Sequence, residues 1–349
     1  MEGLKKQGLT LTILDHMPEK LLDLKAEELH YALSGPTLIH LPGEKPEPLF
    51  VSVLQHGNEH SGWEAIKYIL KKYQLNALPR ALSLFIGNVD AAKVNTRFIS
   101  EQGDFNRMWG SSTAPAHPCM QTVISDLQTR SVFLSIDIHN NTGKNPHYAC
   151  INRTDKHFIQ LASHFSKNIV YFTKPEGVQS LVFSAFCPAI TLECGLSGDI
   201  DGIEQAILYL DYCINLESLE QLEPPTKDHT VYHVVGTARI RDHLAFDFAN
   251  SNQTDLLDFC LNPELEQTNF TQLQAGYQLG KCGTQIKEFP IQVLAEDGED
   301  VSDEYLSNEG DWLNLKRDVV PAMFTPNIDI IRKDCLCYFM EPYPITSRS

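Results

Sequence analysis

Alternating strand and helix patterns in the first two-thirds of the chain constrain its fold most strongly. Apolar runs that predict buried strands occupy residues 49–54, 81–89, 131–138, 168–172 and 187–192. Apolar residues at helical spacing predict helices over 61–73, 120–127 and 202–216, with Thr154 as the expected N-cap of a further helix. Strands that alternate with helices predict an α/β layer structure, with a largely parallel or mixed sheet flanked by helices.

The pattern changes after residue 221. Residues 222–228 combine two prolines with several charges, which predicts a linker. Short alternating runs separated by turn residues follow, and this pattern is typical of a small all-β domain. For a chain of 349 residues, we therefore predict an α/β domain over residues 1–224 and a smaller β domain over residues 225–349.

Charge and cysteine content narrow the classes of function. The formal net charge of -17 argues against a general nucleic-acid binder, which would present a basic face. No stretch is apolar and long enough to span a bilayer, and the first twenty residues lack a signal-peptide pattern. The nine cysteines are odd in number and scattered, which disfavours a secreted disulfide scaffold. We expect a cytoplasmic protein without nucleic-acid or membrane partners, and a homo-oligomer is compatible with the sequence.

A strand-like run ends on a histidine in the segment "LFVSVLQHGNEHSGWE", residues 49–64. As letters, His56 to His60 fit the H-x-x-E-H pattern, in which two histidines on one helical turn bind zinc. The glycine and asparagine between them are poor helix formers, and helical spacing starts only after His60. The favoured interpretation takes His56 and Glu59 as ligands on a turn at the carboxyl end of a strand. Taken alone, the pair would suit a surface ion pair.

Two other apolar strands end in residues that complete such a site. His139 ends one of them in "LSIDIHNNTG", and Asp137 points to the same side of that strand. Glu193 ends the other in "CPAITLECG", where a carboxylate is costly unless it is paired, solvated or used in chemistry. A catalytic zinc needs a third protein ligand and a position for water, so His139 fits as ligand and Glu193 as general base. An exposed strand-end glutamate is the alternative for Glu193.

Between the first two of these segments lies the polar loop "GNVDAAKVNTRFISEQGDFNRMW". A hydrolase that cuts an amide bond gains from a cation near the developing oxyanion, and an arginine of this loop, such as Arg97 or Arg107, can supply it. An arginine such as Arg107 can also bind a substrate carboxylate in a bidentate manner. Asp104 and Asn106 lie beside it in the sequence. The alternative is a loop with solvated arginines.

Taken in order, "HGNE", "GNVDA…TRF…DFNRMW", "DIHNNTG" and "TLECG" resemble the succinylglutamate desuccinylase and aspartoacylase group of the zinc carboxypeptidase-like hydrolases. The resemblance covers about residues 49–202, and the linker and trailing β domain fit the layout of that group. It implies one zinc ion per chain, held by His56, Glu59 and His139. On this resemblance His60 is not a ligand.

The same resemblance implies roles for the remaining residues. Glu193 would activate water and protonate the leaving amine, while Arg97 would polarise the scissile carbonyl and hold the oxyanion. Asn106 and Arg107 would bind a substrate carboxylate. Asp104 would hydrogen-bond the first zinc histidine and fix its tautomer.

The sequence departs from this group in two places. The stretch between Arg97 and Asn106 is longer by a couple of residues. Aspartoacylases also carry an arginine shortly before the catalytic glutamate, whereas residues 176–193 contain no arginine or lysine. The sequence therefore predicts neither specificity for N-acetylaspartate nor a second anion anchor for a desuccinylase substrate. The nearest basic residues in the sequence are Lys144, Arg153 and Lys174.

Together these features predict a zinc-dependent hydrolase that cleaves the amide bond of a small N-acyl amino acid or a related carboxylate-bearing amide. One alternative is a metallocarboxypeptidase that trims peptide C-termini with the same residues. Another is a non-catalytic zinc-containing or ligand-binding protein of the same fold. A serine or cysteine hydrolase is disfavoured, because there is no G-x-S-x-G motif and Cys194 would point away from Glu193 on a strand.

Overall fold

The computed structural model describes residues 9–74, 78–225, 228–248 and 257–344. The chain divides into two compact units. The first comprises residues 1–140 and 147–229, and the second comprises residues 141–146 and 230–349. The predicted domain boundary after residue 224 falls beside residues 226–227, which lie outside the described residues together with that part of the predicted linker. The boundary therefore stays a prediction.

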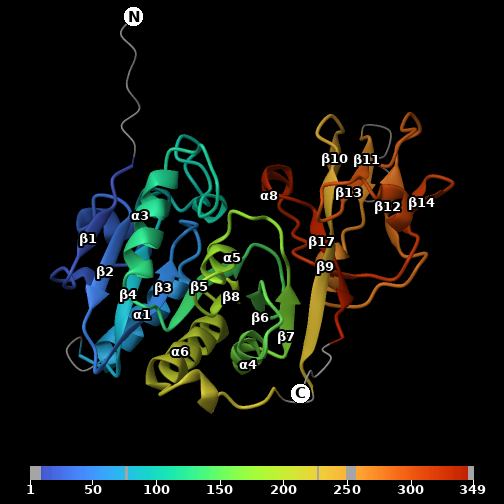
Figure 1. The fold of residues 1–349 in the computed structure, drawn as a ribbon. Helices are drawn as coiled ribbons and strands as arrows, with labels where there is room; N and C mark the ends of the chain where they lie inside the picture. The colour runs from blue at the N-terminus through green and yellow to red at the C-terminus, as the bar shows by residue number, and fades with distance from the viewer. Residues whose placement is uncertain (1–8, 75–77, 226–227, 249–256, 345–349) are drawn as a thin grey trace, which may run out of the picture. The chain divides into compact units, whose positions relative to one another are not determined.

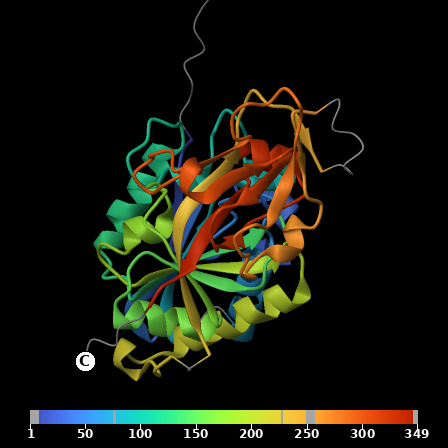
Figure 2. The ribbon, with the colours of Figure 1, turned by 90° about the vertical axis from the view of Figure 1, so that its right-hand side faces the viewer.

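A mixed sheet forms the centre of the first unit, with the described strands in the order β1-β2-β4-β3-β5-β8-β6-β7 (Figure 1). The strands are β1 Thr12–Leu14, β2 Thr37–Leu41, β3 Lys45–Val53, β4 Arg80–Ile86, β5 Leu134–Asn141, β6 Tyr148–Ile151, β7 Asn168–Tyr171 and β8 Ala189–Leu196. Strand β3 runs parallel to both β4 and β5, whereas β2 is antiparallel to β4 and β6 is antiparallel to β8. Figure 2 shows the twist of this sheet as a fan of strands.

Helices connect and cover these strands, as the alternating pattern predicted. The α-helices are α1 Ser61–Lys72, α2 Val89–Lys93, α3 His117–Gln128, α4 Lys156–Phe165, α5 Gln179–Phe183 and α6 Ile200–Asn215. Short 3₁₀ helices are η1 Leu21–Asp23, η2 Ala26–Tyr31, η3 Phe105–Arg107 and η4 Leu219–Gln221. The prediction of Thr154 as a helix N-cap is wrong. Asp155 occupies the N-cap of α4 without capping it, and its carboxylate accepts a 2.6 Å hydrogen bond from Arg153 Nε instead.

Burial on both faces explains why the central strands are mostly apolar in sequence. Residues 49–53 of β3 are all buried, and so is every residue of β5. Helix α1 buries Trp63, Ile66 and Leu70 and packs against α6. The candidate polar residues therefore gather toward the carboxyl ends of β3 and β5. The predicted strand end at His139 is wrong by two residues, because β5 continues to Asn141.

The second unit is built mainly from short β-strands, which confirms the predicted smaller β domain. Strand β9 Thr230–Ile240 pairs antiparallel with β13 Ile291–Leu294 and with β17 Cys337–Pro342, which also pairs with β16 Val320–Ala322. A second sheet has the order β10 Phe246–Asp247, β11 Phe259–Leu261, β12 Gln278–Cys282, β15 Trp312–Leu315 and β14 Leu306–Glu309. The remaining elements are η6 Leu265–Thr268, α7 Ser302–Tyr305 and α8 Ile328–Lys333.

Residues 141–146 cluster with this second unit although the sequence analysis assigned them to the first domain. The Asn145 Oδ1 atom accepts a 3.0 Å hydrogen bond from the Met323 backbone. Gly143 approaches the Phe324 carbonyl so closely that a Cβ atom would lie 2.1 Å from its oxygen. No side chain larger than hydrogen fits at that contact.

All nine cysteines are free thiols, and every one except the partly exposed Cys282 is buried. In the part of the chain that the structure describes, no helix has the length and apolarity that a membrane span requires.

Candidate metal centre

The turn after β3 carries the first two candidate ligands. Leu54 adopts a left-handed conformation with φ of 55°, which turns the chain away from the strand direction. Its carbonyl accepts a 2.6 Å hydrogen bond from the Asn88 backbone, and the Gly57 backbone donates to the Arg97 carbonyl at 3.0 Å. A Cβ atom on Gly57 would lie 2.2 Å from the Ala91 backbone, so only glycine allows this close approach.

The helical H-x-x-E-H interpretation is excluded by where the helix starts. Helix α1 begins at Ser61, with His60 at its N-cap, so His56 and Glu59 lie on the preceding turn. The His60 ring lies 3.2 Å from the Gly57 carbonyl and is not part of the group that could hold a metal ion.

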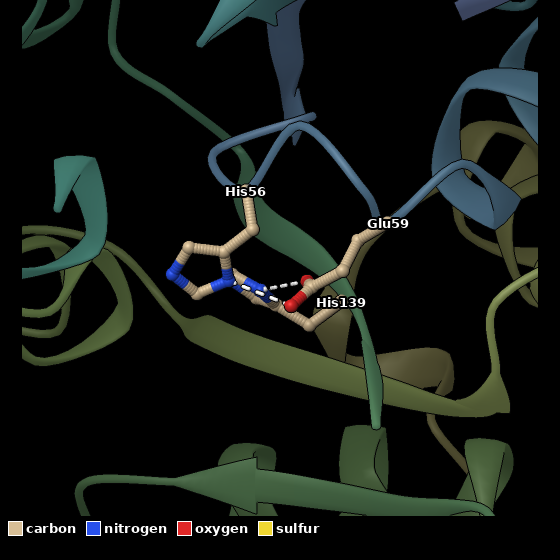
Figure 3. Close-up of side chains that lie close together, drawn as sticks. All are labelled: His56, Glu59 and His139. Atoms are coloured by element: carbon tan, nitrogen blue, oxygen red, sulfur yellow. Dashed lines mark hydrogen bonds and ion pairs between the residues drawn. The ribbon is translucent and has the colours of Figure 1, made fainter. Parts of the chain in front are cut away.

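His56, Glu59 and His139 converge in a buried cluster (Figure 3). The His56 Nδ1 atom lies 2.7 Å from Glu59 Oε1, and His139 Nδ1 lies 2.6 Å from Glu59 Oε2. One potential ligand atom from each residue lies within 4.8 Å of the others. Only 3% of His56, 6% of Glu59 and 3% of His139 is exposed. The sequence-predicted ligands are therefore brought together, shielded from water.

The charges of this cluster are strongly coupled. Burial raises the pKa of the Glu59 carboxyl, but His56 and His139 outweigh burial and hold that pKa below its ordinary value. For His139, burial lowers the pKa, whereas the carboxylates of Asp137 and Glu59 raise it well above its ordinary value. A negative carboxylate between two imidazoles is thus the favoured state.

Two imidazoles and one carboxylate form a donor set that suits a catalytic zinc ion, which keeps a further position for water or substrate. Hard cations such as Mg²⁺ and Ca²⁺ prefer sites made of oxygen atoms, so the two nitrogen donors favour a transition metal or zinc. Both Nδ1 atoms face the same carboxylate, which is the arrangement expected if all three groups share one cation. The residues therefore fit the metal that the sequence resemblance implies.

Asp104 lies where the sequence analysis placed it. Its Oδ1 atom is 3.0 Å from His56 Nε2 and also accepts a 2.9 Å hydrogen bond from the Asn106 backbone. Burial raises the pKa of Asp104, but His56, Arg107 and Arg97 together lower it well below its ordinary value. An ionised Asp104 holds the Nε2 proton of His56, which leaves Nδ1 facing Glu59.

The two predicted arginines border the same cluster. Arg97 Nη2 lies 3.4 Å from Asp104 Oδ2, and Arg97 Nη1 lies 4.0 Å from Glu59 Oε1. Arg107 Nη1 donates to the Asn106 carbonyl at 3.0 Å. The Arg97 side chain is 13% exposed. Its positive charge therefore lies at the rim of the buried cluster.

Asn106 differs from the expected role of a substrate anchor, because its amide is engaged by the protein. Its Oδ1 atom accepts a hydrogen bond from the Gln179 backbone at 3.3 Å. Its Nδ2 atom lies 3.2 Å from His139 Nε2. The residue is 9% exposed, so in this structure its side chain helps to build the cluster.

Glu193 lies inside β8 and not at its end, because the strand continues to Leu196. Burial raises the pKa of its carboxyl to about 7, and the neighbouring charges of Glu59 and Asp137 add to this effect. The imidazoles of His139 and His56 act in the opposite direction. The carboxyl therefore lies in the electric field of the histidine–glutamate cluster and exchanges a proton near neutral pH.

The alternating faces of β8 separate Glu193 from the adjacent thiol. Cys194 is fully buried, and burial, with the charges of Glu193 and Glu59, raises the pKa of its thiol well above its ordinary value. A thiol that stays protonated is a poor nucleophile, in agreement with the prediction against a cysteine hydrolase.

The sequence analysis did not identify Asn140 as a site residue. Its backbone donates to Glu59 Oε2 at 3.2 Å, and its side-chain Nδ2 donates to Ser61 Oγ at 2.9 Å and to the Gly195 carbonyl at 3.1 Å. Its Oδ1 accepts from the Ser61 backbone at 3.2 Å. Asn140 thus joins the turn that carries Glu59 to the strand that carries Glu193. Its position directly after His139 was the only signal in the sequence.

A hydrogen-bonded series of buried side-chain amides beside the cluster was also not predicted. Gln55 Oε1 accepts a 2.6 Å hydrogen bond from Trp109 Nε1, and Gln55 Nε2 donates to Gln179 Oε1 at 3.1 Å. The Gln179 backbone in turn fixes the amide of Asn106. Gln55 directly precedes His56, which could have indicated its importance, whereas nothing in the sequence singles out Gln179.

Arg153 and Lys174, the two residues of the first unit that the sequence analysis named as the nearest basic residues, do not form a second anion site. Arg153 pairs with Asp155 at 2.6 Å, and Lys174 pairs with Glu176. Lys144 belongs to the second unit, where its backbone donates to Glu266 Oε1 at 3.0 Å.

Comparisons with known proteins concern the family and the fold. Residues 48–205 match the family described as the succinylglutamate desuccinylase/aspartoacylase catalytic domain. No curated protein sequence matches the chain significantly.

Several solved structures have a similar fold. One is a succinylglutamate desuccinylase from Chromobacterium violaceum, with a TM-score of 0.54 and 16% identity over 86% of this chain and 87% of that chain. Another, described as succinylglutamate desuccinylase/aspartoacylase from Rhodobacter sphaeroides, has a TM-score of 0.57 and 13% identity over 88% and 89% of the two chains. A variant of murine aminoacylase 3 has a TM-score of 0.50 and 16% identity over 86% and 95%. The similar α/β fold and the family match together confirm the resemblance seen in the motifs: residues 48–205 of this chain match the succinylglutamate desuccinylase/aspartoacylase catalytic domain.

Proposed function

We propose that this protein is a zinc-dependent deacylase that hydrolyses the amide bond of a small N-acyl amino acid or a related carboxylate-bearing amide. The observation that supports this most directly is the buried cluster of His56, Glu59 and His139, whose charges act on the Glu193 carboxyl. The match of residues 48–205 to a family named for desuccinylase and aspartoacylase activities supports an amide-bond deacylase.

In this proposal His56, Glu59 and His139 hold one zinc ion per chain. When bound, zinc supplies Lewis-acid chemistry: it polarises a carbonyl oxygen and lowers the pKa of water. Asp104 keeps the His56 ring in the orientation in which Nδ1 faces Glu59. Asn140 holds Glu59 through its backbone N–H group.

Glu193 acts as the proton carrier. It accepts a proton from the attacking water, the water oxygen bonds to the carbonyl carbon, and Glu193 then gives the proton to the departing nitrogen as the C–N bond breaks. A free carboxylic acid and a free amine are the products. A pKa of about 7 suits a group that must both take and return a proton near neutral pH.

The two arginines share the remaining tasks. The Arg97 guanidinium, at the rim of the cluster, stabilises negative charge on the carbonyl oxygen. Arg107 binds the substrate carboxylate. The predicted share of Asn106 in that binding has little support, because its amide contacts Gln179 and His139.

The substrate is proposed to carry a single carboxylate, which leaves its acyl group uncharged. Residues 176–193 contain no arginine or lysine, and Arg153 and Lys174 pair with neighbouring carboxylates. A second carboxylate on the substrate would therefore find no matching cation in these segments of the first unit. The nine free thiols support action in a reducing compartment such as the cytoplasm.

The test combines metal analysis with a substrate panel. Purified protein should contain about one zinc per chain. Zinc-loaded protein should hydrolyse N-acetyl amino acids, whose acyl group is uncharged, faster than N-succinyl amino acids. Short peptides with free C-termini form the control panel, and faster turnover of these would favour the metallocarboxypeptidase alternative. Tight zinc binding without turnover of any amide in the panel would contradict the proposal and favour a non-catalytic zinc protein.

A further inference from the structure

The two candidate zinc histidines share a pattern that extends beyond their ligand atoms. Each ring turns Nδ1 toward Glu59 and Nε2 toward an aspartate. For His56 the aspartate is Asp104, at 3.0 Å. For His139 it is Asp137, whose Oδ2 atom lies 2.9 Å from Nε2. No role for Asp137 followed from the sequence resemblance.

Asp137 is anchored by the neighbouring strand. Its Oδ1 atom accepts a 2.6 Å hydrogen bond from Ser52 Oγ. Ser52 on β3 is the register partner of Asp137 on β5, so the pairing of the two parallel strands itself brings the hydroxyl to the carboxylate. Ser52 is fully buried and Asp137 is 1% exposed. The result is a continuous buried chain of contacts from Ser52 through Asp137 and His139 to Glu59.

The environment of His139 Nε2 would otherwise favour the wrong tautomer. Asn106 Oδ1 is committed to the Gln179 backbone N–H group, so the amide nitrogen of Asn106 is the atom that faces Nε2 at 3.2 Å. An amide N–H group donates, and it would favour an Nε2 atom without a proton. The proton would then reside on Nδ1, where it would block a metal ion. Asp137 can only accept when ionised, and therefore holds the proton on Nε2.

We propose that Asp137, anchored by Ser52, is a positioning residue that fixes the tautomer and ring orientation of His139. Its carboxylate keeps the proton on Nε2 against the amide of Asn106 and leaves the Nδ1 lone pair directed at the metal. This inference rests on the proposed function in one respect, namely that His139 is a zinc ligand.

The primary test measures zinc affinity on metal-free full-length protein, by competition with a chromophoric chelator. Asp137→Asn keeps the shape of the side chain but replaces the accepting carboxylate, and it should weaken zinc binding by about 10- to 100-fold. Ser52→Ala should weaken binding to a smaller extent, and Ser52→Thr, which keeps the hydroxyl, should restore it. Ser83→Ala is the matched control, because Ser83 is an equally buried strand serine whose hydroxyl contacts His40.

A second readout separates positioning from a merely structural effect. In ¹⁵N-histidine-labelled, zinc-saturated protein, the His139 Nε2 proton should resonate far downfield because it donates to a carboxylate. The signal should move upfield in Asp137→Asn and in Ser52→Ala, and should keep its position in Ser52→Thr and Ser83→Ala. If Asp137→Asn fails to fold, the two Ser52 variants carry the test.

The outcomes distinguish this inference from the proposed function. Wild-type protein that binds no zinc overturns both. Wild-type protein that binds zinc, while Asp137→Asn binds it within twofold and keeps the downfield signal, overturns only the role of Asp137. A Ser52→Thr variant as weak as Ser52→Ala overturns the role of the hydroxyl as anchor.

Discussion

Replacement of Glu193 by glutamine tests the proposed proton carrier through stability as well as turnover. Burial raises the pKa of this carboxyl from an ordinary 4.5 to about 7 in the folded protein. Between these pH values the folded protein binds more protons than the unfolded chain, so stability falls as the pH rises. At about pH 8 the ionised Glu193 carboxylate would lower the free energy of unfolding by roughly 3 kcal/mol. Because Glu193 is partly exposed, this figure is an upper limit.

Glutamine is neutral at every pH, so Glu193→Gln removes this penalty. The metal-free variant should be more stable than wild type near pH 8, by at most about 3 kcal/mol, and the difference should vanish near pH 4.5. Urea unfolding of metal-free protein across this pH range measures the difference. Glu204→Gln, at an exposed position of α6, is the control and should show no such pH dependence.

The same substitution should abolish most of the activity. Loss of a general base costs about 10²- to 10⁴-fold in kcat, while zinc content should stay at the wild-type level because Glu193 is not one of the three grouped ligands. In wild type, kcat/KM should fall as the pH drops below the pKa of Glu193, and bound zinc should shift this limb toward acid. A variant that keeps more than a tenth of the activity and gains no stability near pH 8 would refute both the role and the electrostatic reasoning.

Three further predictions concern the frame of the site. Zinc at about 100 times its Kd should raise the free energy of unfolding by about 2.7 kcal/mol; a melting temperature that does not respond to zinc would contradict a site in the folded protein. Gly57→Ala should cost about 1–3 kcal/mol in urea unfolding, because its Cβ would lie 2.2 Å from the Ala91 backbone, and unchanged stability would show that the turn can relax. Asn140→Ala should cost about 1–3 kcal/mol by leaving buried partners on Ser61 and Gly195 unpaired. Alanine keeps the backbone N–H that holds Glu59, so zinc binding should weaken only because this backbone loses its side-chain anchors; normal affinity would exclude such an anchoring role of the side chain.

Much of the first unit could be predicted because its central strands are buried on both faces. Residues 49–53 and 134–138 are mostly apolar, so the run of polar residues that follows each of them stood out. The cluster of His56, Glu59 and His139 follows from the convergence of strand ends at one edge of a sheet.

Contacts made by side-chain amides could not be predicted in the same way. The sequence resemblance implied that Asn106, together with Arg107, binds a substrate carboxylate. Its actual partners, Gln179 and His139, are 73 and 33 residues away in the chain. An amide serves as donor and acceptor in many surroundings, so its partner depends on tertiary packing that no local pattern encodes.

Short elements were missed for a related reason. Strand β1 has three residues, none of them buried, and β6 has four, which is too few for a periodic signal. The assignment of residues 141–146 to the second unit depends on contacts with residues more than a hundred positions away, such as Met323. Only the folded chain reveals that such a segment changes unit.

The nine cysteines, eight of them buried, can report local opening of the folded protein. Five lie in the first unit, at positions 119, 150, 187, 194 and 213, and four lie in the second, at 260, 282, 335 and 337. Alkylating reagents reach a shielded cysteine only when its surroundings open. Modification followed by peptide mass mapping would therefore measure the rate of local opening in each unit separately. Cys282 should label first, and Cys194, adjacent to Glu193, should label among the last.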